Sequence, residues 1–224
     1  MIAIDGPILR DDEIHYNPRA CEKAFVLGAF QKRCKPGESH FGEGAGLRRA
    51  GCDTAKQFSG YAPLTELSVP FPRIQKGNNI VEAFPNAFMG VMLNEGLYLL
   101  AKDLVRGEKS DWLYEMCVQI DQFHNLLDHL DLEDARFQNS INSTTDHDER
   151  AALVCCLTAL CVTSGGYVAV GEPKNGYFFL PPWEMWESWA KSNLINNMTS
   201  GRLPAPISIW ISGTEFVSPD NLPD

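Results

Sequence analysis

The sequence predicts an α/β protein whose acidic residues gather at one edge of a sheet. Residues 2–7 (IAIDGP) and 79–85 (NIVEAFP) share one pattern, in which apolar residues that favour strands lead to a carboxylate and then to a proline. Proline has no N–H for a sheet ladder, so a central strand must end there. Segments with helical apolar spacing lie between and after the two predicted strands, which is typical of an α/β chain.

The two strands predict a shared acidic site, because each carries a carboxylate near its carboxyl end: Asp5 and Glu82. In open α/β sheets, ligands bind at that edge. Carboxylates bind Mg²⁺, and a pair of ions about 3.5–4 Å apart can clamp the two oxygens of a phosphoryl transfer. The alternative also remains open: each acid caps the next segment or pairs with an arginine such as Arg19.

Size and composition restrict the class of protein. A length of 224 residues favours one domain, which we place at residues 1–216, with a frayed tail at 217–224. Apolar residues make up 44% of the chain, enough for a core. The formal net charge of −10 disfavours anionic membranes and a strong non-specific grip on nucleic acid.

Localisation is predicted to be cytoplasmic. The longest apolar run, residues 151–162, is too short to span a bilayer, so no membrane partner is expected. The N-terminus lacks the basic and apolar regions of a signal peptide. Seven cysteines are an odd number, and two of them lie in the most apolar segment, which favours reduced thiols over a disulfide framework.

The first half of the chain is predicted to combine helices with glycine-rich loops. Residues 19–33 have helical spacing weakened by Gly28, and residues 87–105 have helical character that Gly107 should end. Residues 35–51 contain five glycines and one proline, which predicts a loop. Residues 63–77 are rich in proline and predict another loop.

The second half is predicted to be helical at first and then to form strands. Residues 111–130 form the clearest amphipathic helix, and residues 132–145 are polar and loop-like. Residues 146–162 are apolar almost all round, so this helix should be buried, and two glycines at 165–166 should end it.

A hairpin and a further strand should follow this helix. Residues 167–170 and 177–180 flank a turn, and isoleucines alternate with polar or aromatic residues at 207–212. Trp183, Trp186 and Trp189 share one face of a short helix, where they cover a core more often than they stack on bases.

The start of the helix at residues 146–162 offers a third carboxylate. Asp146 and Glu149 have the spacing of a capping box, so we predict that Asp146 caps the helix. Asp148 is left as a candidate for the acidic cluster.

The basic, glycine-rich stretch at residues 32–49 could cradle phosphate or a nucleic-acid backbone. A solvated surface loop is the more usual meaning of such a stretch. Cys34, His40 and Cys52 do not have the spacing of a zinc site.

Several short stretches, in order along the chain, resemble one known family. The matching stretches lie at residues 4–7, 19–22, 33–42, 81–85, 148–155 and 176–181. Together they are similar to the uncharacterised, mainly prokaryotic proteins described as predicted RNase H-like nucleases (domain of unknown function, series number four-two-nine). The resemblance implies a three-layer RNase H-like α/β fold and a divalent-metal site, with Asp5 and Glu82 at positions of family acids.

The chain departs from the family pattern in two places. The family usually opens with a β-hairpin region whose first strand carries a further aspartate, whereas this chain begins at what would be a later strand. The family also has an aspartate where this chain has Ala151, and Asp148, one turn earlier, is the candidate replacement. Both departures favour a copy that is inactive, truncated or completed by a partner chain, and a homo-oligomer is therefore one possibility.

The leading hypothesis is a nuclease that depends on Mg²⁺ or Mn²⁺. Asp5, Glu82 and Asp148 would be the catalytic metal ligands, and the metal-bound water would be the nucleophile. Residues expected to meet phosphate or substrate are Arg19, Lys35, His40, Arg48 and Arg49. The second hypothesis is a catalytically inactive binding or scaffold protein, and the third is a small-molecule phosphate enzyme. The nuclease hypothesis requires the side chains of Asp5 and Glu82 to converge.

Overall fold

The computed structural model describes residues 1–8, 18–34, 37–58, 60–63, 78–101, 104, 108–132, 134–216 and 222–223. Four features predicted from the sequence lie wholly or mainly outside these residues: the candidate Lys35, most of the loop at 63–77, the helix stop at Gly107 and most of the tail.

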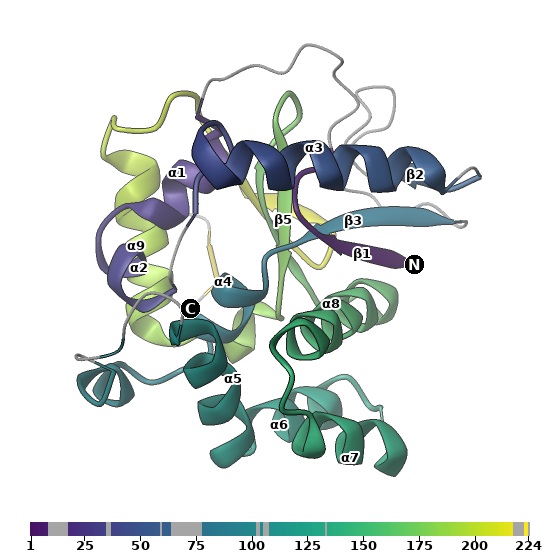
Figure 1. Ribbon diagram of the computed structural model, residues 1–224. Helices are drawn as coiled ribbons and strands as arrows, with labels where there is room; N and C mark the ends of the chain where they lie inside the picture. Colours follow the sequence, from purple (N-terminus) through teal and green to yellow (C-terminus); the bar gives the residue numbers. More distant parts are fainter. Residues whose placement is uncertain are drawn as a thin grey trace.

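A mixed sheet of seven strands forms the centre of the described structure (Figure 1). Its strands are β1 (Ile2–Asp5), β2 (Ala62–Pro63), β3 (Asn79–Ala83), β4 (Val168–Glu172), β5 (Gly176–Leu180), β6 (Ser208–Ile211) and β7 (Thr214–Phe216). The order is β1-β3-β5-β4-β6-β7, with β2 paired to β3. Strands β1, β2 and β5 run parallel to their neighbour β3, while β4, β6 and β7 form antiparallel pairs. The two strands with an acid near the carboxyl end, the hairpin and the late strand are therefore confirmed.

Helices cover both faces of the sheet, which confirms the α/β class (Figure 1). They are α1 (Ala20–Val26), α2 (Ala29–Arg33), α3 (Gly42–Gln57), α4 (Pro85–Gly90), α5 (Lys109–Gln119), α6 (Gln122–His129), α7 (Ala135–Ser143), α8 (His147–Ser164) and α9 (Ser188–Thr199), with 3-10 turns η1 (Glu95–Leu99) and η2 (Trp183–Met185). On one side, α1 packs on β4 and β5, and α3 packs on β1. On the other side, α8 packs on β1, β3 and β5.

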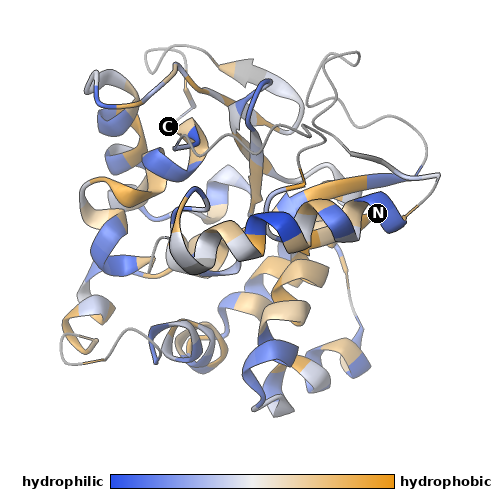
Figure 2. Ribbon diagram, turned by 45° about the horizontal axis from the view of Figure 1, so that its top comes forward, coloured by the Kyte–Doolittle hydropathy of each residue, from blue (hydrophilic) through white to orange (hydrophobic). Residues whose placement is uncertain are grey.

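The hydrophobic core fills the space between the sheet and these helices. Strands β3 and β5 are buried at every residue. Figure 2 shows hydrophobic residues concentrated on the strands and on α8, the helix that lies below them. Burial of such apolar surface contributes about 25 cal/mol per Å² to the stability of the fold. No helix of the described part combines the length and apolar character needed to cross a membrane.

The prediction of a loop at residues 35–51 is wrong over most of its length, because α3 begins at Gly42. The glycines there serve close packing. A Cβ on Gly51 would lie 2.5 Å from the carbonyl oxygen of Pro7, and one on Gly44 would lie 2.2 Å from that of Glu38. Two glycines thus let the helix lie against the backbone that leaves β1 and the backbone that precedes the helix.

The prediction of a loop at residues 132–145 is also wrong, because α7 occupies most of it. Asp134 caps this helix: its side chain accepts hydrogen bonds from the N–H groups of Arg136 and Phe137, at 2.9 and 3.2 Å. Ile141 is buried, and Phe137 is half-buried one turn earlier. Two apolar residues at this spacing gave too weak a helical signal in the sequence.

Two predicted long helices are each interrupted by a residue in the left-handed region. The segment at 19–33 divides into α1 and α2 at Gly28, whose φ is 63°. The segment at 111–130 divides into α5 and α6 at Asp121, whose φ is 57°. The segment at 87–105 contains the end of α4 and the turn η1. Apolar spacing continues across these breaks, so the spacing alone could not locate them.

The helix predicted at 146–162 is confirmed as α8, although its expected burial is only partly correct. Gly165 ends it with φ 84°. One flank of α8 reaches solvent, because Ala152, Cys156 and Thr163 are exposed. The core role of the tryptophans is confirmed by Trp183 and Trp186, which are 1% and 4% exposed.

Replacement of the α8 cap should weaken the fold measurably. The Asp146 carboxylate accepts the N–H groups of Asp148 and Glu149 at 3.0 and 3.1 Å. We expect Asp146→Ala to lower the free energy of unfolding by about 1 kcal/mol, measured by urea denaturation. Asp146→Ser retains a capping oxygen and should lose much less. An equal loss in both variants would contradict a capping role.

Candidate functional site

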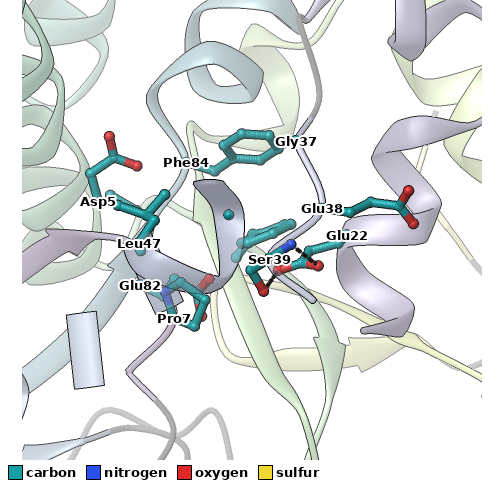
Figure 3. A pocket seen from close by; sticks show the side chains of 13 residues that line it. Asp5, Pro7, Glu22, Gly37, Glu38, Ser39, Leu47, Glu82 and Phe84 are labelled. Carbon is teal, nitrogen blue, oxygen red and sulfur yellow. Dashed lines mark hydrogen bonds between the residues drawn. The ribbon is translucent and has the colours of Figure 1, made fainter. Parts of the chain in front are cut away.

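A cavity of about 90 Å³ lies at the carboxyl ends of β1 and β3 (Figure 3). Asp5 and Glu82 both line it, as expected for acids at the ends of adjacent strands. Glu22 and Glu38 add two further carboxylates, and the remaining lining includes the apolar residues Leu47, Phe84 and Phe178. The strand ends thus form a small pocket with an acidic rim and a largely apolar wall.

The strand register places the two acids on opposite faces of the sheet. Ile4 is paired with Glu82, and Asp5 with Ala83. Because successive side chains of a strand point to opposite faces, Asp5 shares a face with Ala83 while Glu82 shares one with Ile4. Figure 3 shows the Asp5 carboxylate directed away from Glu82. The expectation that these two side chains converge is therefore wrong.

Glu82 is held by Arg19 in a buried ion pair with two hydrogen bonds. Arg19 Nη1 donates to Glu82 Oε1 and Nη2 donates to Oε2, both at 2.6 Å. Arg19 is 0% and Glu82 is 1% exposed. This bidentate geometry is the strongest form of a carboxylate–guanidinium contact. Of the alternatives left open by the sequence, pairing with Arg19 is the one that the structure adopts for Glu82.

Arg19 also joins three separate segments of the chain. Its Nη1 lies 3.1 Å from Glu22 Oε1, and its Nε donates to the carbonyl oxygen of Asn175 at 2.7 Å. The guanidinium lies 5.4 Å from the centre of the Phe178 ring. One side chain therefore connects the start of α1, the end of β3 and the β4–β5 turn.

Glu22 extends the same hydrogen-bond network to Ser39, in the segment that precedes α3. It accepts a hydrogen bond from the backbone N–H of Ser39, at 2.9 Å, and another from the Ser39 hydroxyl. Both residues are buried, at 3% and 5% exposure. Glu22, Ser39 and Asn175 were not identified as site residues from the sequence. The spacing of Arg19 and Glu22, three residues apart at a helix start, is the signal that could have indicated their contact.

Burial and charge oppose each other within this network. Burial raises the pKa of Glu82, and the Arg19 guanidinium opposes that rise. Burial alone would lower the pKa of Arg19, but the carboxylates of Glu82 and Glu22 raise it. The positive charge of the guanidinium thus compensates the cost of burying the carboxylates of Glu82 and Glu22. Both oxygens of Glu82 accept hydrogen bonds from the Arg19 guanidinium.

Asp5 faces α8 on the other side of the sheet. The residue as a whole is exposed, although protein atoms crowd its carboxyl group. This crowding raises the pKa of Asp5 to about 6, and the charge of His147 partly opposes the rise. Cys155 on α8 lies close to Asp5. Burial is the main cause that raises the pKa of the Cys155 thiol to about 12, and the negative charge of Asp5 adds to the rise.

The start of α8 carries one further carboxylate, that of Asp148. Asp148 is exposed and stands three and seven residues before Ala151 and Cys155, which places all three on one side of the helix. His147 is within 3.0 Å of Asp111, which also contacts Arg150. Among the described residues, no three acids, histidines or cysteines are grouped to hold a metal ion. Within this part of the chain, the residues therefore do not form the expected site for Mg²⁺ or Mn²⁺.

Those predicted phosphate-binding residues that the structure describes do not form one basic surface. Arg19 is occupied in the buried network, and Lys35 lies outside the described residues. Arg48 is buried in α3 at 6% exposure, and Arg49 beside it is exposed. His40 is half-buried, with its ring 4.5 Å from that of Phe41.

Comparison of the chain with protein-family models, with curated proteins and with solved structures finds no match.

Loss of the Arg19 guanidinium should destabilise the fold strongly. Arg19→Met leaves Glu82 and Glu22 buried without a counter-charge, so we expect the free energy of unfolding to fall by about 3–5 kcal/mol at pH 8. The loss should be smaller at pH 5, because unpaired buried carboxylates take up protons. Chemical denaturation at both pH values measures it. The exposed Arg49→Met serves as the control, and a similar loss in both variants would contradict the role given to Arg19.

Asp5 should make the stability of the protein depend on pH. Its folded pKa of about 6 lies above the ordinary value of 3.8, so the folded state favours the protonated form. The associated stability is present below about pH 4 and is lost as the pH rises toward 6. The stability of Asp5→Asn relative to wild type should therefore increase across this window and then level off. Unfolding measurements from pH 3.5 to 8 test it; a difference that stays constant would exclude the shift.

Proposed function

We propose that the chain is a binding or scaffold module of the RNase H-like group that does not hydrolyse phosphodiesters by itself. The commitment of Glu82 to Arg19, on the face opposite to Asp5, is the observation that carries this proposal. The family acid at position 82 here stabilises the junction of three chain segments.

The energetics of the ion pair support this proposal. A metal ligand must turn its oxygens toward the ion, and Glu82 would have to leave Arg19 to do so. That move would leave the Arg19 guanidinium, which is 0% exposed, without Glu82 as its partner. An uncompensated buried charge costs several kcal/mol. Two-metal hydrolysis also requires ligands that surround ions about 4 Å apart. Asp5 and Glu82 project to opposite sides of the sheet and do not provide that arrangement.

The resemblance and the charge support the same class of function. The stretches at 19–22 and 81–85, which resemble the family, contain Arg19, Glu22 and Glu82, three members of the buried network. A sheet covered by helices on both faces agrees with the three-layer arrangement that the resemblance implies. The net charge of −10 disfavours a long polyanionic substrate.

One observation favours a second candidate, a Mg²⁺- or Mn²⁺-dependent nuclease in which Asp5 acts with residues of α8. Asp5 is solvent-accessible at the carboxyl edge of the sheet, and Asp148 and Ala151 share the side of α8 that carries Cys155. Such a site requires at least one more carboxylate, supplied from outside the described residues. This candidate does not use Glu82.

Metal binding and cleavage separate the two functions. We expect calorimetric titration of the protein with MnCl₂ to show no tight binding that depends on Asp5. Single- and double-stranded DNA, RNA and hybrids should remain intact with Mn²⁺. Glu82→Gln should reduce stability without affecting either measurement. Tight Mn²⁺ binding or turnover that Asp5→Asn abolishes would overturn the scaffold proposal in favour of the nuclease.

A further inference from the structure

Strand β1 leaves one edge of the sheet open within the described part of the chain. It is the terminal strand of the order and pairs with β3 on one side. Ile2, Ala3 and Ile4 are only partly buried, whereas every residue of β3 is buried. Proteins usually protect an edge strand with lysine, proline or a bulge. The apolar residues of β1 have none of these features, so this edge is suited to pairing with another strand.

The helix packed on β1 presents a flank of small residues beside this edge. Ala152, Cys156, Ala159 and Thr163 recur at spacings of four, three and four, and three of them are exposed. The buried residues Val154, Leu157 and Cys161 occupy the opposite flank of α8. Small side chains let a second helix approach to an axial distance near the lower end of the usual 8–10 Å range, so this flank is suited to a neighbouring helix.

An apolar groove connects the open edge with this flank. It has a volume of about 520 Å³ and extends from Met1, at the start of the sheet edge, to Cys156 and Leu160 on α8. Leu132 and Phe137 form its other side. Among the described residues that line it, Asp134 is the only one with a charged side chain, and Met1 adds the charged N-terminus. The groove shares Cys156, Ala159 and Thr163 with the flank and reaches Met1, the residue before β1. Strand edge, helix flank and groove therefore adjoin one another and form one surface.

We propose that a second copy of this chain covers this surface. An occupant must supply a strand for β1 and, on the same face of the sheet, a helix for the flank of α8. The chain itself contains that unit, since α8 packs on β1. A two-fold axis beside β1 would pair β1 with its copy in antiparallel fashion and place α8 beside the α8 of the second copy. Such an interface is isologous, the common form in homodimers.

The spacing of strands and helices is consistent with this symmetry. Paired strands lie about 4.8 Å apart, whereas packed helices lie about 8–10 Å apart. The two helices can be farther apart than the two strands because α8 also packs on β3 and β5, which displaces it from the edge. A single added strand would leave the α8 flank uncovered, and a single helix would leave the β1 edge unpaired. The dimer does not depend on the proposed function, since no step of its argument uses Glu82 or a metal.

Sedimentation analysis of the full chain, over a wide range of concentration, tests the proposal. We expect a reversible dimer whose dissociation constant decreases with added salt, because the net charge of −10 on each copy is repulsive and salt screens it. Cys156→Glu and Ala152→Glu place a charge on the exposed flank and should weaken the dimer roughly tenfold or more. Asn196→Glu, on the exposed side of α9, is the matched control and should have no effect.

Two further measurements locate the interface. Mild oxidation should link two copies through Cys156, and Cys156→Ser should abolish the link while Cys52→Ser does not. Hydrogen exchange of residues 2–5 should be slower in the wild-type dimer than in Cys156→Glu. A wild-type chain that stays monomeric would overturn the proposal and leave the edge to a strand of another protein. A dimer unaffected by either glutamate variant, with unchanged exchange in β1, would overturn it as well.

Discussion

The buried contact between Arg19 and Glu82 is the interaction on which the arrangement of the sheet edge depends. A guanidinium with no solvent exposure fixes the end of β3, the start of α1 and the β4–β5 turn relative to one another. Glu22 extends this network to Ser39, just before α3. Burial of charge rarely stabilises a fold by itself, but a partly broken network is costly, which restricts the chain to one arrangement.

The same contact gives one of the two acids near strand ends a structural role. Seen in the sequence, Asp5 and Glu82 are two equivalent acids, each near the end of a strand. In the fold they differ in exposure and in partners. Glu82 is buried and paired with Arg19, whereas Asp5 is exposed and lies against α8. A cluster that binds metal requires its acids to have a common environment, and these two do not.

Features set by neighbouring residues could be predicted from the sequence, and features set by distant contacts could not. The strands before Pro7 and Pro85, the hairpin and the Asp146 cap depend on local chemistry, and all were predicted. The helix α3 was missed because its glycines were interpreted as signs of a loop. In the fold, Gly51 and Gly44 instead allow close contact with the backbone of Pro7 and of Glu38, and both of these residues lie outside the helix. The opposite orientation of Asp5 and Glu82 depends on the register between β1 and β3, and no single segment contains that information.

The close approach of Gly51 to Pro7 has a mechanical consequence. At this point α3 rests directly on the backbone that leaves β1, with no side chain between them to absorb a displacement. Leu47 of the same helix and Asp5 of the strand both line the cavity. Any movement of α3 toward the strand must therefore displace the strand end as well, and the width of the cavity mouth is coupled to the position of one helix.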